Sequence, residues 1–209
     1  MITIENIRVF NFDGAIMGMR NPMNSWDKSD SYPDPLNLIE PYHIGENDLD
    51  LMRRLYKAGT EHRKYARQIF VSMDIIAPLY WWKEFDTYKV GTTSNSCSTM
   101  HKIHAKPFEP IDFSNEHLLE DKDMWGVFNT ILAGLNVSRE KFLKTKNKQY
   151  WWHMIQLLPS SYNQKRTITM TYENVFSIIH QRSGHKLDEW QDLCKKLKAL
   201  PYIKEIMDE

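Results

Sequence analysis

Residues 66–104, ARQIFVSMDIIAPLYWWKEFDTYKVGTTSNSCSTMHKIH, constrain the fold more than any other part of this chain. Residues 68–76 form a β-branched and aromatic run, which predicts a largely buried strand. Pro78 is tolerated in a first helical turn, so we expect a short helix over 79–88. Residues 92–99 are small and mostly polar, which predicts a loop. Such a loop suits a phosphate in an α/β protein, although its composition fits a solvated surface loop equally well.

Composition and charge limit the class of protein. The chain has 209 residues, with 27 acidic and 27 basic side chains, and we expect a single domain over 1–209. No bulk charge attracts nucleic acid or an anionic membrane, so neither is expected as a partner and any anion site must be local. Cys97 and Cys194 have neither metal spacing nor a disulfide framework. With no signal-peptide pattern and no apolar window of membrane length, these features predict a cytoplasmic protein.

Apolar periodicity predicts further elements along the chain. Alternating residues predict strands at 2–12 and 167–171. Helical spacing predicts helices at 15–20, between Gly45 and Gly59, and at 115–143, 149–158, 172–181 and 185–200. Residues 24–41 carry three prolines and read as a loop long enough for a lid or an inter-subunit arm.

General catalytic and binding motifs are absent from the sequence. There is no GxGxxG, no phosphate-loop lysine motif, no HExxH and no GxSxG. His101 and His104 are spaced to reach one metal on a helix, but two histidines are a weak signal and we expect no metal site. The basic run 141–148, KFLKTKNK, fits a solvated face better than a phosphate site.

The order of several short patterns is more informative than any one motif. A Pro-led helix is followed by a Ser/Asn-rich segment, a Leu-Pro turn, and a helix that ends in Arg before His-x-x-x-Glu. The residues that carry these patterns are Pro78, Asn95–His101, Leu158-Pro159, Arg182 and His185–Glu189. This succession resembles the flavin-dependent thymidylate synthases, in which a P-x-F-x-x-R-Q-W-x-R-H-R-x-x-S-x-N-E-x-S-x-R-Y segment holds the flavin phosphates and the nucleotide. The resemblance runs over most of the chain.

The resemblance implies an α/β (α+β) fold of the thymidylate synthase-complementing-protein type, with a mixed, antiparallel-leaning sheet flanked by helices. It also implies a homotetramer, a pyrimidine deoxynucleotide ligand, FAD as cofactor and a folate-type carbon donor. Carried over position by position, the nucleotide-binding residues are Lys83, Glu84, Lys89, Asn95, Ser96, Ser98 and Arg182. The cofactor-binding residues are Tyr88, Thr92, His101 and His185. No catalytic residue is identified.

The sequence departs from the family pattern where the flavin phosphates would lie. Lys83-Glu84 replaces Arg-Gln, and residues 87–89 are Thr-Tyr-Lys in place of Arg-His-Arg. Met100 stands where the family has a nucleotide-binding Arg. Lysine does not reproduce the bidentate fork of arginine, so we expect weakened flavin binding.

Three functions are compatible with these observations. The first is a divergent flavin-dependent thymidylate synthase-like enzyme that transfers a one-carbon group to a pyrimidine base. The second is a nucleotide-binding or sequestering protein, or a non-flavin nucleotide-modifying enzyme, on the same fold. The third is a structural oligomer with an aromatic interface. Structural roles also compete for single residues: Arg182 as a helix-end cation, His185 as a helix cap, and Trp81-Trp82 as core.

Overall fold

The computed structural model describes residues 2–36 and 42–208. Its strands are β1 (Thr3–Phe10), β2 (Tyr32–Pro33), β3 (Tyr42–His43), β4 (Phe70–Pro78), β5 (Thr92–Ser96) and β6 (Asn163–Thr171). Its α-helices are α1 (Phe12–Arg20), α2 (Glu46–Lys57), α3 (Leu79–Phe85), α4 (Lys122–Thr145), α5 (Lys148–Leu157), α6 (Tyr172–Arg182), α7 (Asp188–Lys198) and α8 (Ile203–Met207).

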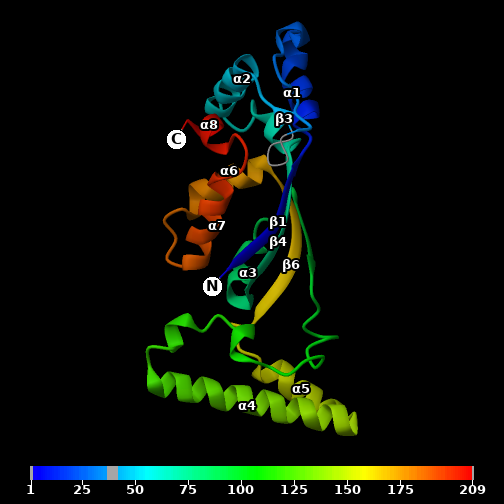
Figure 1. The fold of residues 1–209 in the computed structure, drawn as a ribbon, viewed down its shortest axis with the longest axis vertical. Helices are drawn as coiled ribbons and strands as arrows, with labels where there is room; N and C mark the ends of the chain where they lie inside the picture. The colour runs from blue at the N-terminus through cyan, green and yellow to red at the C-terminus, as the bar shows by residue number, and fades with distance from the viewer. Residues whose placement is uncertain (1, 37–41, 209) are drawn as a thin grey trace. The chain divides into compact units, whose positions relative to one another are not determined.

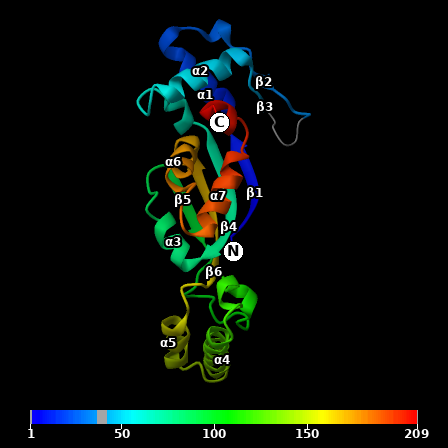
Figure 2. The same ribbon diagram turned by 90° about the vertical axis from the view of Figure 1, so that its left-hand side faces the viewer.

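Four strands form a small antiparallel sheet in the order β1-β4-β6-β5, and helices flank it (Figure 2). β2 and β3 pair separately as a two-stranded antiparallel ribbon. The central strands β4 and β6 carry the buried alternating residues, whereas the edge strand β1 is mostly exposed. The predicted fold class, a mixed α/β fold with an antiparallel-leaning sheet flanked by helices, is confirmed.

The predicted loop over residues 92–99 is wrong for its first five residues. Thr92–Ser96 form β5, which lies beside β6 at the edge of the sheet. The backbone N–H of Cys97 donates to the carbonyl of Lys165 (2.9 Å), which continues the alignment. Threonine suits a pleated strand, and pairing with β6 occupies backbone groups that a phosphate cradle would need.

Several other predicted boundaries also differ: for example, β1 ends at Phe10 and α1 already begins at Phe12. α4 begins at Lys122, because the Asp121 side chain caps it by accepting from the N–H groups of Asp123 and Met124. β6 begins four residues earlier than predicted. The last predicted helix ends with α7, and the additional helix α8 follows Tyr202, whose φ is 59°.

The predicted lid or arm over residues 24–41 is described only in part. Its residues Tyr32–Pro33 belong to β2, and Trp26–Lys28 form a 3-10 turn. Residues 37–41 lie outside the described part of the chain, so a lid or arm stays a prediction.

The chain divides into two compact units. Unit 1 comprises Met1–Thr3, Ile75–Thr87 and Asn95–Thr167; unit 2 comprises Ile4–Asp74, Tyr88–Ser94 and Ile168–Glu209. The expectation of a single domain over 1–209 stays a prediction.

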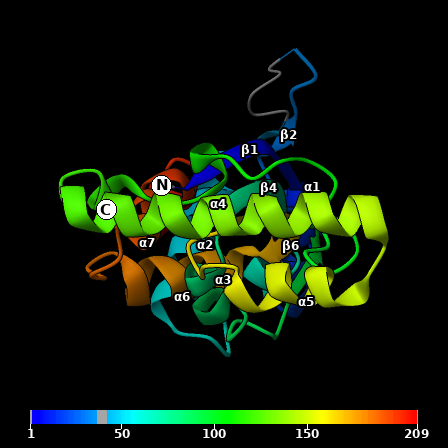
Figure 3. The same ribbon diagram turned by 90° about the horizontal axis from the view of Figure 1, so that it is seen from below.

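Unit 1 has a core between the antiparallel helices α4 and α5, which lie side by side (Figure 3). Its buried cluster consists of Ile103, Phe108, Phe113, Phe128, Leu135 and Met154. The α3 rings of Trp81, Trp82 and Phe85 are buried as well, with centroids 4.8–5.4 Å apart. The prediction that Trp81-Trp82 belongs to the core is therefore confirmed.

Unit 2 packs α6 against α7 and α2 against α8 (Figure 1). Its interior includes Met52, Tyr65, Tyr172 and Trp190, all essentially inaccessible to solvent. Over residues 2–36 and 42–208, no helix combines the length and apolar character needed to cross a membrane.

Candidate functional site

An arginine lying on two aromatic rings is the most distinctive polar feature of unit 2. Nε of Arg182, at the end of α6, donates to the hydroxyl of Tyr88 (2.9 Å). The guanidinium carbon lies 4.6 Å from the ring centroid of Trp190 and 5.7 Å from that of Tyr88. The Tyr88 hydroxyl in turn donates to Oε1 of Gln181 (3.0 Å). We call Tyr88, Arg182 and Trp190 the arginine–aromatic cluster.

The start of α6 holds the segment that carries Tyr88. Thr171 and Asn174 form a capping box at this helix end. Nδ2 of Asn174 also donates to the carbonyl of Val90 (2.8 Å). Gly91 follows with φ of 73°, and a Cβ at this position would lie 2.8 Å from Oδ1 of Asn174. The turn therefore requires glycine for both its conformation and its close approach to Asn174.

His185 lies beside the same cluster, with its ring centroid 6.2 Å from that of Trp190. Its Nδ1 accepts from the backbone N–H of Leu187 (3.1 Å), the residue that precedes α7. This bond lies just before α7, whose N-cap Leu187 has no side-chain cap bond, so the helix-cap role of His185 stays a prediction. Its predicted contact with a cofactor stays a prediction.

Thr92 has a buried hydroxyl, and no described residue forms a hydrogen bond with its Oγ1. An unsatisfied buried hydroxyl costs roughly 1–3 kcal/mol, so a polar ligand atom or a water molecule at this position would be stabilising. Lys89, three residues earlier, is exposed. Both residues belong to unit 2 and were predicted from the sequence to contact ligand.

The other predicted site residues belong to unit 1. Lys83 is exposed and Glu84 is half-buried on α3, while Asn95 and Ser96 are exposed on β5. Oγ of Ser98 accepts from the backbone N–H of His101 (2.9 Å), which closes a turn. Within unit 2, the structure thus brings together Tyr88, Arg182 and His185; the ligand roles of all predicted residues stay predictions.

Arg166 is a prominent residue that the sequence interpretation missed. Its guanidinium carbon lies 4.2 Å from the Trp82 ring centroid, and its Nη1 donates to Oδ1 of Asp86 (2.7 Å). Its Nε donates to Oε1 of Gln164 (2.9 Å). The available signal was the alternation of residues 164–170, which places Arg166 on the same strand face as the buried Ile168. Because the predicted strand began at residue 167, Arg166 was not assigned to that face.

The chemistry of the arginine–aromatic cluster is that of binding. A fixed guanidinium recognises phosphate or carboxylate. Arg182 and Tyr88 are half-buried, whereas the Trp190 ring is buried and supports the guanidinium from the interior of unit 2. The nearby thiol of Cys194 is buried on α7, and burial raises its pKa, so it is not a nucleophile at neutral pH. Across residues 2–36 and 42–208, no three His, Cys, Asp or Glu side chains gather as metal ligands.

Comparison with solved structures identifies proteins of the same fold. The chain is similar to thymidylate synthase X from Helicobacter pylori, solved with FAD and dUMP, with a TM-score of 0.69 and 18% sequence identity. A second structure of the flavin-dependent thymidylate synthase from that organism, also complexed with FAD and dUMP, gives 0.67 and 18%. Each match covers 100% of this chain and 97% of the other chain. At 18% sequence identity, this similarity shows that the fold is shared.

Comparisons of sequence give no relatives. No protein-family model matches the chain, and no curated protein does either. The chain is thus defined as a protein of the flavin-dependent thymidylate synthase fold, while the residues of its site must be judged from its own geometry.

That geometry fits the phosphates of FAD poorly. In the segment 87–89, Oγ1 of Thr87 donates to the carbonyl of Glu84 (2.7 Å), and the Tyr88 hydroxyl is bonded to Arg182 and Gln181. Lys89 is the only cation that this segment supplies.

Proposed function

We propose that this chain is a divergent flavin-dependent thymidylate synthase-like protein that binds a pyrimidine deoxynucleotide. The proposed reaction is transfer of a one-carbon group from a folate-type donor to the base, with FAD, where present, held weakly. The arginine–aromatic cluster is the observation that carries the proposal. The full-length likeness to proteins solved with FAD and dUMP supports the choice of nucleotide.

Arg182 suits a phosphate because its geometry is fixed before a ligand arrives. The Nε bond to Tyr88 and the stacking on Trp190 restrain the guanidinium plane. A restrained fork loses less conformational entropy when it forms charge-assisted bonds to an anion. Lys89, the residue after Tyr88, carries a further positive charge, and Thr92 in the same segment has a buried hydroxyl for which no described residue is a hydrogen-bond partner.

The same observations favour one alternative, a nucleotide-binding or sequestering protein, or a non-flavin nucleotide-modifying enzyme. Residues 87–89 lack the two arginines of the family segment, whereas the Arg182 cluster is present. Loss of flavin phosphate contacts does not remove a nucleotide site, because the two depend on different side chains. Binding of nucleotide without flavin would support this alternative.

Thermal melting with a panel of nucleotides tests the proposal. dUMP, dCMP, UMP and AMP are each added at increasing concentration, and the shift in melting temperature is measured. A ligand at 100 times its Kd stabilises the folded protein by about 2.7 kcal/mol. For a chain of this size that is roughly 5–11 °C. We expect the largest shift with a pyrimidine deoxynucleotide; no shift with any member of the panel contradicts the proposal.

Arg182→Ala is the informative variant, and Arg54→Ala is its matched control. Arg54 is an exposed arginine of unit 2 whose Nε lies 2.9 Å from Oδ2 of Asp50. Because Arg182 also stacks on Trp190, its removal is expected to lower the melting point without ligand. The ligand-induced shift is therefore the quantity compared: we expect Arg182→Ala to lose most of it and Arg54→Ala to keep it.

We further propose that the chain assembles as a homotetramer and that α4 supplies a contact face. Residues 124–138 contain no charged side chain, yet Met124, Val127 and Val137 are exposed. Gly126 and Gly134 lie about 80° apart around the helix axis. Apart from the neighbouring residues and backbone of α4 itself, no described atom comes within 4 Å of a Cβ placed on either. A mid-helix glycine costs about 1 kcal/mol relative to alanine, and close approach of a second copy would offset this cost.

A further inference from the structure

The turn between α4 and α5 concentrates positive charge on a chain whose net charge is zero. Residues 139–148 contain five basic residues and one acidic residue, Glu140. The lysines at 141, 144, 146 and 148 are all exposed. Opposite charges elsewhere balance this segment, so the neutral total conceals a local attraction for phosphate.

Aromatic rings are interleaved with these lysines. Three ammonium groups lie 5.6–6.0 Å from ring centroids: Lys141 over Tyr150, Lys146 over Phe142, and Lys148 over Trp152. Alternation of cations with aromatic faces is typical of surfaces that follow a single strand of nucleic acid.

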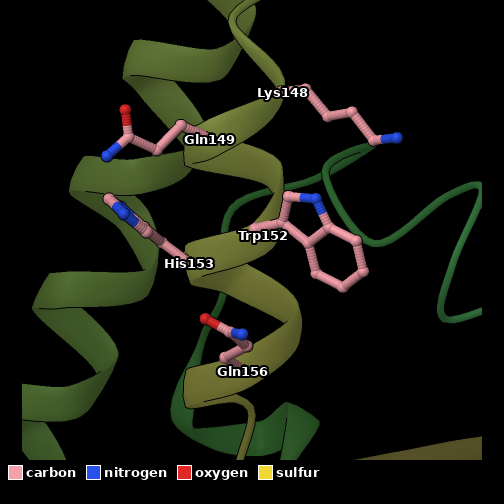
Figure 4. A pocket seen from close by; sticks show the side chains of 5 residues that line it. All are labelled: Lys148, Gln149, Trp152, His153 and Gln156. Carbon is pink, nitrogen blue, oxygen red and sulfur yellow. The ribbon is translucent and has the colours of Figure 1, made fainter.

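A shallow hollow of about 620 Å³ opens along the same part of α5. It is lined by Lys148, Gln149, Trp152, His153 and Gln156. Figure 4 shows Lys148 and Trp152 projecting to one side of the helix, and Gln149 and His153 to the other. The Trp152 side chain is 44% exposed. Its indole offers a base a stacking face, and the two carboxamides offer hydrogen bonds to base edges.

We propose that this basic–aromatic surface, formed by residues 139–156 of α4 and α5, binds single-stranded nucleic acid. The lysines contact successive phosphates, and one base stacks on Trp152. This proposal reverses the expectation, drawn from net charge alone, that nucleic acid is not a partner. It is independent of the nucleotide site proposed in unit 2.

The spacing of the lysines favours a chain of phosphates over a single one. Lys141 and Lys144 are separated by about 4.5 Å along the α4 axis, and Lys148 begins the next helix. The carboxamides of Gln149 and Gln156 favour bases over the acyl chains of a membrane, which offer no hydrogen bonds.

Fluorescence anisotropy of a labelled dT20 oligonucleotide tests this surface. Three to four phosphate contacts predict a slope of log K against log salt of roughly −2 to −3. Affinity should therefore fall roughly 20- to 50-fold between 50 and 200 mM NaCl. We expect Trp152→Ala to weaken binding about tenfold and Trp152→Phe to restore much of it, because a phenyl ring still stacks. Lys144→Ala and Lys148→Ala should each reduce the slope by about 0.7.

Two matched controls come from the chain itself. Trp26 is also 44% exposed but belongs to unit 2, so Trp26→Ala should leave dT20 affinity unchanged. Lys122 begins α4, about 33 Å along the axis from Lys144, so Lys122→Ala should leave the salt slope unchanged.

Several results would overturn the proposal. The first is that dT20 does not bind at 50 mM NaCl. The second is that Trp152→Ala and the lysine variants lose no more affinity than their controls. The third is that duplex DNA binds as tightly as single-stranded DNA. Binding to phosphatidylserine vesicles that requires Trp152 and is not displaced by dT20 would assign the surface to a membrane instead. The melting shifts with nucleotides test the unit 2 site independently, because Trp152→Ala leaves the arginine–aromatic cluster intact.

Discussion

Asp48 is a buried carboxylate that joins several segments of unit 2. It forms an ion pair with Arg20, and the two side chains are 0% and 4% exposed. Its Oδ2 accepts from the hydroxyls of Ser29 (2.7 Å) and Ser31 (2.6 Å). Asp48 lies in the first turn of α2, where a negative charge is also favoured by the helix dipole.

These partners determine the pKa of Asp48. Burial alone would raise it, but hydrogen bonds from Ser31, Ser29 and Arg20, together with the charge of Arg20, hold the pKa below its ordinary value. Because the folded pKa is lower than the unfolded value of about 3.9, the resulting stability is present above pH 4. It is lost as the pH falls through the folded pKa.

We expect Asp48→Asn to destabilise unit 2 strongly, because it leaves the Arg20 charge buried without a carboxylate. Breaking a buried pair costs about 3–5 kcal/mol, which lowers the melting temperature by roughly 6–20 °C. Thermal melts from pH 7 to pH 2 measure this, and the difference from wild type should narrow below pH 4. Asp50→Asn is the control, since its pair with Arg54 is exposed and contributes less than about 1 kcal/mol. Equal effects of the two substitutions would contradict this account.

Helix α4 allows a test of self-association. Gly134→Arg places a long charged side chain in the middle of the uncharged face, and we expect it to shift the assembly toward smaller species in light scattering. Arginine is a better helix former than glycine by about 0.8 kcal/mol, so the helix itself should not be weakened. Thr145→Arg adds the same side chain at the end of α4 and should leave the assembly unchanged. If the wild-type chain is monomeric at micromolar concentration, α4 is not a contact face between copies of the chain.

At the scale of the whole molecule, flavin and nucleotide binding should separate. Each charge-assisted hydrogen bond lost from residues 87–89 is expected to cost about 1.5–3 kcal/mol, a factor of roughly ten to a hundred in affinity. We therefore expect the purified protein to show little flavin absorbance and to bind added FAD more weakly than dUMP. Equilibrium titrations of the two ligands measure the difference. Tight, stoichiometric binding of FAD would contradict this account of Thr87, Tyr88 and Lys89.

Much of the fold could be predicted from local patterns. The runs that became β4, α2 and α6 combine strong periodicity with Gly45 at one helix start and Thr171 at another. The fold could also be inferred from the order of patterns along the chain, because the succession of Pro78, the Ser/Asn-rich segment and Arg182 resembles that of the flavin-dependent thymidylate synthases. Periodicity, caps and the order of patterns can all be recognised along the chain, so they do not depend on contacts between distant residues.

Strand β5 and Arg166 show where local patterns were insufficient. Residues 92–96 have the composition of a loop, and they become a strand because β6 satisfies their backbone groups. Arg166 reads as one of 27 basic residues until Trp82, Asp86 and Gln164 surround it. The decisive partners, β6 for β5 and Trp82 and Asp86 for Arg166, lie about 70 to 85 residues away along the chain.

For this protein, the sequence by itself indicated most of the helices, the central strands, the resemblance to the flavin-dependent thymidylate synthases and the absence of arginine at 87–89. Only the tertiary structure decided which polar residues meet. Arg182 acquires its fixed orientation from Tyr88, 94 residues away, and from Trp190 on the next helix. Periodicity depends on neighbours along the chain, whereas the geometry of a site depends on side chains that only folding brings together.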